Sequence, residues 1–264
     1  MYKLLVLIGI ISISASPCLA QSQPPIEAYG ELPEIRLAAL SDSGTKIAML
    51  LESDGAPRVA IYDLEGGAPQ AVGTGEAQVR GLDFARDDTV ILKASETTRT
   101  RGYSGRFEYS GASSLDLETM DVQLLLKGAT RGLWPAQSGL GKIIGHSTSS
   151  RHIYMPGWWA NNEFSDPEYH VFRVDLETGR GRILLRGRTD TIDWIVSSAG
   201  EMIAREDYSN SKNQYQVFAK VDGKTKLIYE QSDVARPPLS LMGVMPDKSA
   251  LVISTDRDLG YFHL

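Results

Sequence analysis

The sequence repeats a short unit in which an apolar segment, a small polar turn and a second apolar segment follow one another. Five copies run along the chain: Leu37–Leu51, Val79–Leu92, Leu133–Ile144, Ile192–Ala204 and Leu239–Ile253. Self-similarity of this kind is the signature of a repeat architecture, which has to be recognised before single motifs are interpreted. The copies constrain the fold more than any other feature of the chain.

A second unit alternates with the first: a segment of alternating polarity that ends at an acidic turn and then returns. The turn carries an aspartate in four places, Asp63, Asp116, Asp175 and Asp222. Alternation bounded by Asp and Gly is typical of a β-hairpin. Two hairpins per repeat make four strands, recurring about every 50 residues, which predicts the blade of a β-propeller.

We therefore expect an all-β fold, a β-propeller of four-stranded blades with about four complete blades and a truncated fifth. Because blades pack face to face, each is apolar on both broad sides, which accounts for a continuous apolar run such as Ile47–Leu51. A β-sandwich of roughly eight strands is the alternative. The repetition of matched strand-turn-strand copies favours the propeller.

Charge excludes one large class of function. The chain has 27 Lys and Arg against 33 Asp and Glu, a net charge of −6, and no long basic run. Such a chain lacks the electrostatic footprint of a nucleic-acid-binding protein. We expect no nucleic-acid partner.

The first 20 residues have the features of a secretory signal peptide. A short positive start precedes the apolar run Leu4–Ile13, and Cys18–Ala20 offers a small-x-small cleavage site. The run is shorter than the ~20 residues that span a membrane. We expect residues 1–20 to be removed, 21–36 to form a lead-in segment and 37–264 to form the propeller.

Cleavage has a consequence for chemistry, because Cys18 is the one cysteine of the chain. The mature protein would have no disulfide, thiol nucleophile or thiolate ligand. We expect it in the periplasm or outside the cell, with no membrane association once the signal is removed.

The beginning of the chain resembles a known family. The segment Ile26–Ile35 leading into Ala39–Ala48 is similar to the opening of secreted bacterial serine peptidases of the prolyl oligopeptidase family, in their dipeptidyl and acylaminoacyl peptidase-like branch. In the second segment Asp42 stands where that family commonly has Pro, and Ser43 where it commonly has Asp. Val171–Gly179 is also similar to the family's propeller. The similarity extends over roughly residues 24 to 264.

The resemblance implies a propeller followed by an α/β-hydrolase domain with a Ser-Asp-His triad, in which the propeller filters oligopeptide substrates. The nucleophile of such a domain lies in a Gly-x-Ser-x-Gly turn. Two segments nearly match this pattern: Gly145–Ser149, which we interpret as part of a second strand, and Gly102–Gly105. Neither segment is followed by the strand-helix alternation of a hydrolase domain. We expect no catalytic residue in the chain and no hydrolysis by the chain alone.

Metal and cofactor sites are not indicated. The histidines, at positions 146, 152, 170 and 263, do not combine with carboxylates at the spacing of metal ligands. A Gly-rich phosphate loop is also missing from the sequence. We expect no metal and no cofactor.

An aromatic-rich segment, residues 152–169, is the most unusual stretch. We interpret it as a loop inserted between two strands, and a loop that carries Trp158 and Trp159 can anchor a partner domain or a peptide. The other interpretation is that both tryptophans cover the core of their own blade. They are candidate contact residues for a hydrolase domain or an oligopeptide.

A second candidate contact region is the arginine cluster Arg99, Arg101 and Arg106 on an expected loop of the second repeat. Arginine binds carboxylates bidentately, so the cluster suits a peptide carboxylate. The alternative is that the three side chains are simply solvated.

These features together predict a non-catalytic, substrate-gating propeller of a prolyl oligopeptidase-like peptidase, a fragment without its hydrolase domain. A stand-alone periplasmic propeller that acts as a binding or scaffold protein, like the propeller of the Tol system, is the alternative. The fifth copy stops at Gly260–Leu264, which would leave an apolar strand edge and favour self-association.

Overall fold

The structure is a computed structural model. It describes residues 34–53, 56–99, 104–129, 132–134, 137, 139–162, 164–247 and 249–255. The expected signal peptide, most of the lead-in segment, Arg101 and the end of the chain at 260–264 lie outside the described residues.

The described residues form β-strands joined by turns. In chain order the strands are β1 (Ile35–Leu40), β2 (Lys46–Ser53), β3 (Ala56–Asp63), β4 (Gln70–Gly73), β5 (Gln78–Arg86), β6 (Thr89–Thr98), β7 (Phe107–Asp116), β8 (Val122–Leu124), β9 (Gly145–His146), β10 (His152–Trp159), β11 (Glu168–Asp175), β12 (Gly181–Leu185), β13 (Thr191–Val196), β14 (Met202–Ser209), β15 (Gln214–Val221), β16 (Lys224–Gln231), β17 (Leu239–Val244) and β18 (Leu251–Thr255). Within this part of the chain no helix has the length and apolar character that a membrane span requires.

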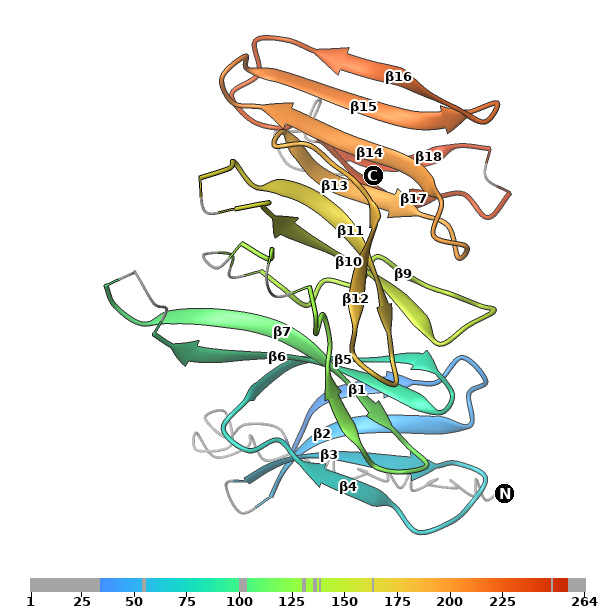
Figure 1. Ribbon diagram of the computed structural model, residues 1–264. Coiled ribbons are helices and arrows are strands. Elements are labelled where there is room, and N and C mark those ends of the chain that lie inside the picture. The colour runs from blue at the N-terminus through green and yellow to red at the C-terminus, as the bar shows by residue number, and fades with distance from the viewer. Residues whose placement is uncertain are drawn as a thin grey trace, which may run out of the picture. The chain divides into compact units, whose positions relative to one another are not determined.

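The strands make five antiparallel sheets in which neighbours in sequence are neighbours in space (Figure 1). Sheet 1 contains β1–β4, sheet 2 β5–β8, sheet 3 β9–β12 and sheet 4 β13–β16, and sheet 5 contains β17 and β18. Four four-stranded meanders and a two-stranded sheet confirm the predicted all-β propeller fold with a shorter fifth unit.

Four of the five predicted strand-turn-strand copies are confirmed as the first two strands of sheets 1, 2, 4 and 5. The third, Leu133–Ile144, is wrong. Its apolar side chains pack against the core between sheets 2 and 3, its described backbone forms isolated bridges at Leu133 and Gly139 instead of strands, and the first strand of sheet 3 is the two-residue β9. Gly145–Ser149 therefore does not lie in a second strand: Gly145 and His146 form the first strand, and Ser147 begins the turn that follows.

The predicted acidic turns join the third and fourth strands of sheets 1 to 4. Asp63, Asp116 and Asp175 end their strands, and each accepts a hydrogen bond at Oδ1 from the backbone N–H two residues further on, at 2.9, 2.9 and 3.1 Å. Such turns of the Asx type reverse the chain with local hydrogen bonds. Asp222 follows β15 and, like Gly223, has a positive φ, the conformation of a tight hairpin turn.

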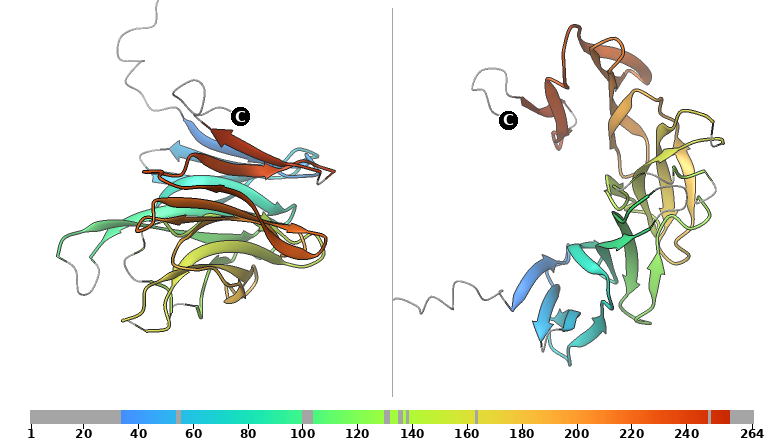
Figure 2. Two further views of the ribbon diagram at one scale, coloured as in Figure 1. Left: turned by 90° about the horizontal axis from the view of Figure 1, so that it is seen from above. Right: turned by 90° about the vertical axis from the view of Figure 1, so that its left-hand side faces the viewer.

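Apolar side chains of consecutive sheets share four cores. One cluster joins sheets 1 and 2, a second joins sheets 2 and 3 around Met155 and Phe172, a third joins sheets 3 and 4 around Trp194, and the last joins sheets 4 and 5 around Tyr215. Sheets 2, 3 and 4 are thus buried on both broad faces, which is why their strands read as nearly continuous apolar runs. The successive sheets can be followed by colour in Figure 2.

Candidate functional site

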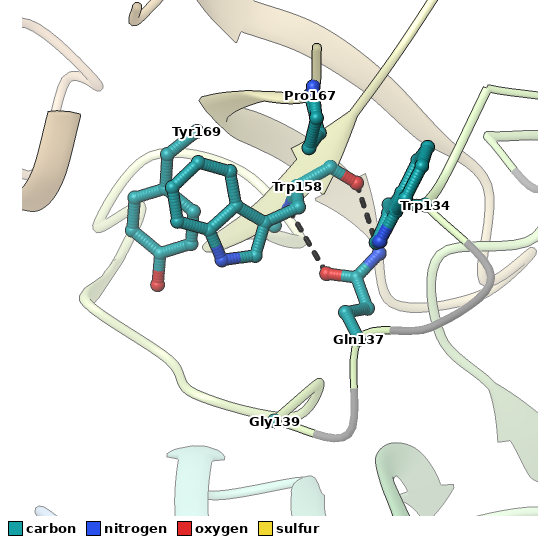
Figure 3. Close-up of a pocket in the computed structure, with 7 residues that line it drawn as sticks. Trp134, Gln137, Gly139, Trp158, Pro167 and Tyr169 are labelled. Atoms are coloured by element: carbon teal, nitrogen blue, oxygen red, sulfur yellow. Dashed lines mark hydrogen bonds between the residues drawn. The ribbon is translucent and has the colours of Figure 1, made fainter. Parts of the chain in front are cut away.

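A cavity of about 480 Å³ opens beside the end of β10 and the start of β11 (Figure 3). The residues that line it are Trp134, Gln137, Gly139, Gly157, Trp158, Pro167 and Tyr169. Ligand pockets commonly measure ~300–1,000 Å³ and are lined by aromatic side chains with a few polar groups. The cavity has this size and this composition.

The segment expected to be an inserted loop is mostly strand. His152–Trp159 is β10 and pairs along its whole length with β11, so both tryptophans lie on a strand. Pro156 and Gly157 suggested a loop because proline has no N–H to donate to a sheet. They are tolerated here because β9 ends opposite Ile153 and Tyr154, which leaves β10 without a strand neighbour on that side from Met155 onward.

Beyond β9, this side of β10 is closed by a short stretch of backbone and by one side chain. Leu133 forms an isolated antiparallel bridge with Trp159, and the Ala160 N–H donates to the Gly132 carbonyl oxygen at 2.8 Å. The Trp158 N–H donates to Gln137 Oε1 at 2.9 Å, and Gln137 Nε2 donates to the Trp158 carbonyl oxygen at 2.9 Å (Figure 3). The Trp134 N–H also donates to this oxygen at 2.9 Å. Since an unpaired backbone group is costly away from water, these bonds hold Trp158 and Trp134 at fixed positions in the cavity wall.

Trp158 forms an aromatic pair with Tyr169 of β11. Their ring centroids are 4.9 Å apart and the planes are inclined by 43°. Burial, with a smaller contribution from the Asp193 carboxylate, raises the pKa of Tyr169 to about 12. The phenol therefore keeps its proton at neutral pH and the pair presents an uncharged surface. Such pairs are rigid, because each ring has few rotatable bonds.

Trp159 points to the opposite face, as alternation along a strand requires. Its indole stacks on His170 at 5.6 Å and packs against the core between sheets 2 and 3. Gly132 allows this position, because a Cβ there would lie 1.8 Å from Trp159 Nε1. His170 is fully buried, its Nδ1 accepts from the Gly187 N–H at 3.1 Å, and burial lowers its pKa. Trp159 is thus a packing residue of this interface.

The two described members of the arginine cluster, Arg99 and Arg106, belong to sheet 2 and do not line the cavity. Arg99 and Arg106 are both exposed and lie in the connection between β6 and β7, as expected. Arg106 Nη2 donates to the Thr97 carbonyl oxygen at 2.8 Å, a bond across its own hairpin. The structure therefore does not bring these arginines together with Trp158, and their role as contact residues stays a prediction.

A serine, a histidine and an aspartate do meet in sheet 3, which the sequence analysis missed. Ser150 Oγ lies 2.9 Å from His152 Nδ1, and His152 Nε2 lies 3.7 Å from Asp175 Oδ2. The Ser150 hydroxyl, however, donates its proton to Ser147 Oγ at 2.9 Å, so it accepts from the imidazole. An imidazole that donates to the hydroxyl is not placed as its general base. Ser147, Ser150 and His152 thus form a hydrogen-bonded turn, and Asp175 lies beyond hydrogen-bond distance of the imidazole.

Within the described ranges, no group of three or more His, Cys, Asp or Glu side chains could hold a metal ion. The cavity beside β10 also presents no carboxylate or imidazole among its lining residues.

Comparison with solved structures finds propeller domains at low identity. The β-propeller domain of the Trilobed protease from Pyrococcus furiosus matches with 12% identity and a TM-score of 0.48, over 85% of this chain and 64% of that one. Pyrococcus horikoshii acylaminoacyl peptidase matches with 10% identity and a TM-score of 0.47, over 88% and 37%. TolB from Acinetobacter baumannii matches with 16% identity and a TM-score of 0.38, over 76% and 45%.

The chain spans less than two thirds of the length of each of these three structures. No protein-family model matches the chain, and no curated protein does.

Proposed function

We propose that the protein is a non-catalytic binding propeller whose cavity at Trp158 and Tyr169 holds a bulky apolar side chain of an oligopeptide. In this role it selects substrates for an α/β-hydrolase domain, as the sequence resemblance to prolyl oligopeptidase-like peptidases implies. The observation that carries the proposal is the cavity of about 480 Å³ whose aromatic pair is fixed by Gln137.

The physical argument is preorganisation. Trp158 is half-buried, so ligand binding covers aromatic surface that is already ordered. Two hydrogen bonds with Gln137, one accepted and one donated by its amide, fix the backbone of Trp158, and Trp194 Nε1 donates to the Tyr169 carbonyl oxygen at 3.0 Å. A wall that does not have to be ordered on binding loses little conformational entropy, which raises affinity for an apolar side chain.

Calorimetric titration with short peptides blocked at both ends tests the proposal. Peptides with one Phe or Trp among small polar residues should bind, and matched peptides with Ala at that position should not. Trp158→Ala should weaken binding at least ~10-fold, since buried aromatic anchors dominate binding energies. Phe164→Ala is the matched control, because Phe164 is an 89% exposed aromatic outside the cavity.

Equal binding by the Trp158→Ala protein, or failure of all aromatic peptides to bind the native protein, would overturn the proposal. The non-catalytic part is tested separately with aminoacyl and prolyl ester substrates, which the purified chain should leave intact. The gating part predicts that an α/β-hydrolase domain with a Gly-x-Ser-x-Gly turn is encoded downstream or beside this chain.

A further inference from the structure

A second cavity lies on sheet 3, near the opposite ends of β10 and β11 from the aromatic cavity. It measures about 310 Å³ and is lined by His152, Arg173, Asp175, Thr178, Arg180 and Arg182. Three of these six residues are arginines, on a chain whose net charge is −6. We call this cavity the arginine pocket.

Strand register places two of the arginines at directly opposed positions. In the antiparallel pair of β11 and β12, Arg173 lies directly opposite Arg182. Like charges at directly opposed positions destabilise a sheet unless something of opposite charge lies between them. Arg180, which precedes β12, adds a third positive charge at the same opening.

The protein itself does not neutralise these charges. Among the described residues, no Asp or Glu forms an ion pair with Arg173, Arg180 or Arg182, whereas Arg36, Arg80, Arg86, Arg151 and Arg205 all have carboxylate partners. These three arginines differ from a single solvated arginine on the surface because they line the same cavity.

Asp175 is the carboxylate in the lining, and it is already engaged. Its Oδ1 accepts from the Thr178 N–H at 2.8 Å, from Thr178 Oγ1 at 2.8 Å and from the Glu177 N–H at 3.1 Å. Its Oδ2 lies 3.7 Å from His152 Nε2. The aspartate thus serves its own turn, and the positive charge of the arginines remains in excess.

We propose that the arginine pocket binds an oxyanion, the phosphate or carboxylate group of a ligand. Guanidinium groups present paired N–H donors whose spacing matches two oxygens of either group. An oxyanion between Arg173 and Arg182 would turn a repulsive cross-strand pair into two charge-assisted contacts. This proposal is tested independently of the one for the aromatic cavity, because the two cavities share no lining residue and the blocked peptides carry no oxyanion that could bind the arginine pocket.

The test is calorimetric titration of the full chain with inorganic phosphate and, separately, with acetate, at low ionic strength in a buffer without competing oxyanions. At least one of the two should bind at millimolar concentration or below. Binding of phosphate alone, or of acetate alone, supports the proposal and identifies the group that the pocket accepts.

Arg173→Gln and Arg182→Gln should each weaken binding at least ~10-fold, and a double variant should not bind. Arg58→Gln is the matched control: Arg58 is also an exposed arginine on a strand, but it lies in sheet 1 and lines neither cavity. It should bind like the native protein.

Thermal unfolding gives a second readout that does not depend on heats of binding. Without added ligand, Arg173→Gln should unfold at the same Tm as the native protein or above it, since the substitution removes a like-charge pair. The binding oxyanion should raise the Tm of the native protein and of Arg58→Gln, and leave that of the double variant unchanged. If neither anion binds the native protein, or both bind the double variant equally well, the proposal is wrong.

Discussion

Two interfaces of the molecule handle charge in opposite ways. Between sheets 2 and 3, Arg151 pairs at the rim with Asp88 at 2.5 Å, with Glu177 at 3.0 Å and with Asp116 at 3.1 Å, and its side chain stays 27% exposed. Between sheets 4 and 5, Glu206 is only 3% exposed, and its Oε1 accepts the Leu241 N–H across the interface. The charged groups between sheets 2 and 3 thus lie at the rim of the interface, whereas the ionisable group between sheets 4 and 5 is buried inside it.

The pKa values follow from this difference. Partial burial by itself raises the pKa of Asp88, but hydrogen bonds from Thr89 and Arg151 and the Arg151 charge outweigh it, so the pKa lies below its ordinary value. For Glu206, burial dominates and raises the pKa to about 7, although the Leu241 N–H opposes the shift. The Arg151 contacts between sheets 2 and 3 are therefore ion pairs, whereas the Glu206 contact between sheets 4 and 5 is made by a carboxyl group that titrates near neutrality.

The two interfaces also differ in apolar content. Among the described residues, eleven buried residues form the cluster between sheets 2 and 3, and seven form the one between sheets 4 and 5. Since burial of apolar surface is the main stabilising term, the first interface should be the more sensitive to loss of a large side chain.

The largest expected effect is therefore at Phe172, which is almost fully buried in the larger cluster. Phe172→Ala should lower the free energy of unfolding by about 3–5 kcal/mol, because it leaves a cavity in a packed core. Leu241→Ala, in the smaller cluster, should cost about 2–3 kcal/mol. Urea unfolding measures both, and an equal or smaller loss for Phe172→Ala would contradict the comparison.

A smaller effect is expected from titration of Glu206. Its pKa in the folded protein, about 7, lies above the ordinary 4.5, so between these values the folded state holds a proton that the unfolded chain releases. The free energy of unfolding should fall as pH rises through this window, by roughly 3 kcal/mol in total. The neighbouring charges of Asp193 and Lys142 act on Glu206 in opposite directions and modify this value.

Glu206→Gln should remove this pH dependence, because the amide oxygen still accepts from Leu241 but does not ionise. At pH 8 the variant should be more stable than the native protein. Glu201→Gln, at an exposed position, is the control and should keep the native profile. Urea unfolding at pH 5, 6, 7 and 8 gives the measurement, and a native profile that is flat in this range would disprove the assignment.

The smallest effect concerns the rim of the first interface. Arg151→Gln should lower the free energy of unfolding at pH 7 by about 1 kcal/mol, since partly exposed ion pairs contribute little. The loss should shrink as pH falls below the ordinary pKa of aspartate, because the depressed pKa of Asp88 stabilises the fold only where the carboxylate is ionised. If the loss stays constant down to pH 3, the Arg151 charge is not its cause.

The sequence predicted correctly those features that depend on contacts between residues close together in the chain. The acidic turns at Asp63, Asp116 and Asp175 were predictable because each aspartate bonds to backbone within three residues of itself. The third repeat was mispredicted because Leu133 and Leu140 are apolar for contacts with the core between sheets 2 and 3, and a pattern of polarity cannot distinguish these contacts from strand alternation.

The candidate sites depended on partners distant in sequence. Trp158 was recognised as unusual, but its place on a strand depends on pairing with Tyr169 of β11, and its other side is bonded by Gln137, 21 residues earlier. Arg173 and Arg182 meet only through the register of two strands, and the partners of Arg151 come from two sheets. No spacing rule in the sequence predicts contacts between residues so distant in the chain, so the arginine pocket could be found only in the three-dimensional structure.

The bond between Gln137 and Trp158 bears on how this fold can change over evolutionary time. In sheet 3 the Gln137 amide and the backbone of Gly132 and Trp134 do the work that a longer β9 would do, and the amide has to reach only one point of β10. Doubling the length of a flexible connection costs only ~0.6 kcal/mol of closure entropy. Between its core residues, the segment that joins sheets 2 and 3 can thus accept insertions at little entropic cost, provided that a glutamine still reaches Trp158, and a new cavity wall can be acquired there without rebuilding a sheet.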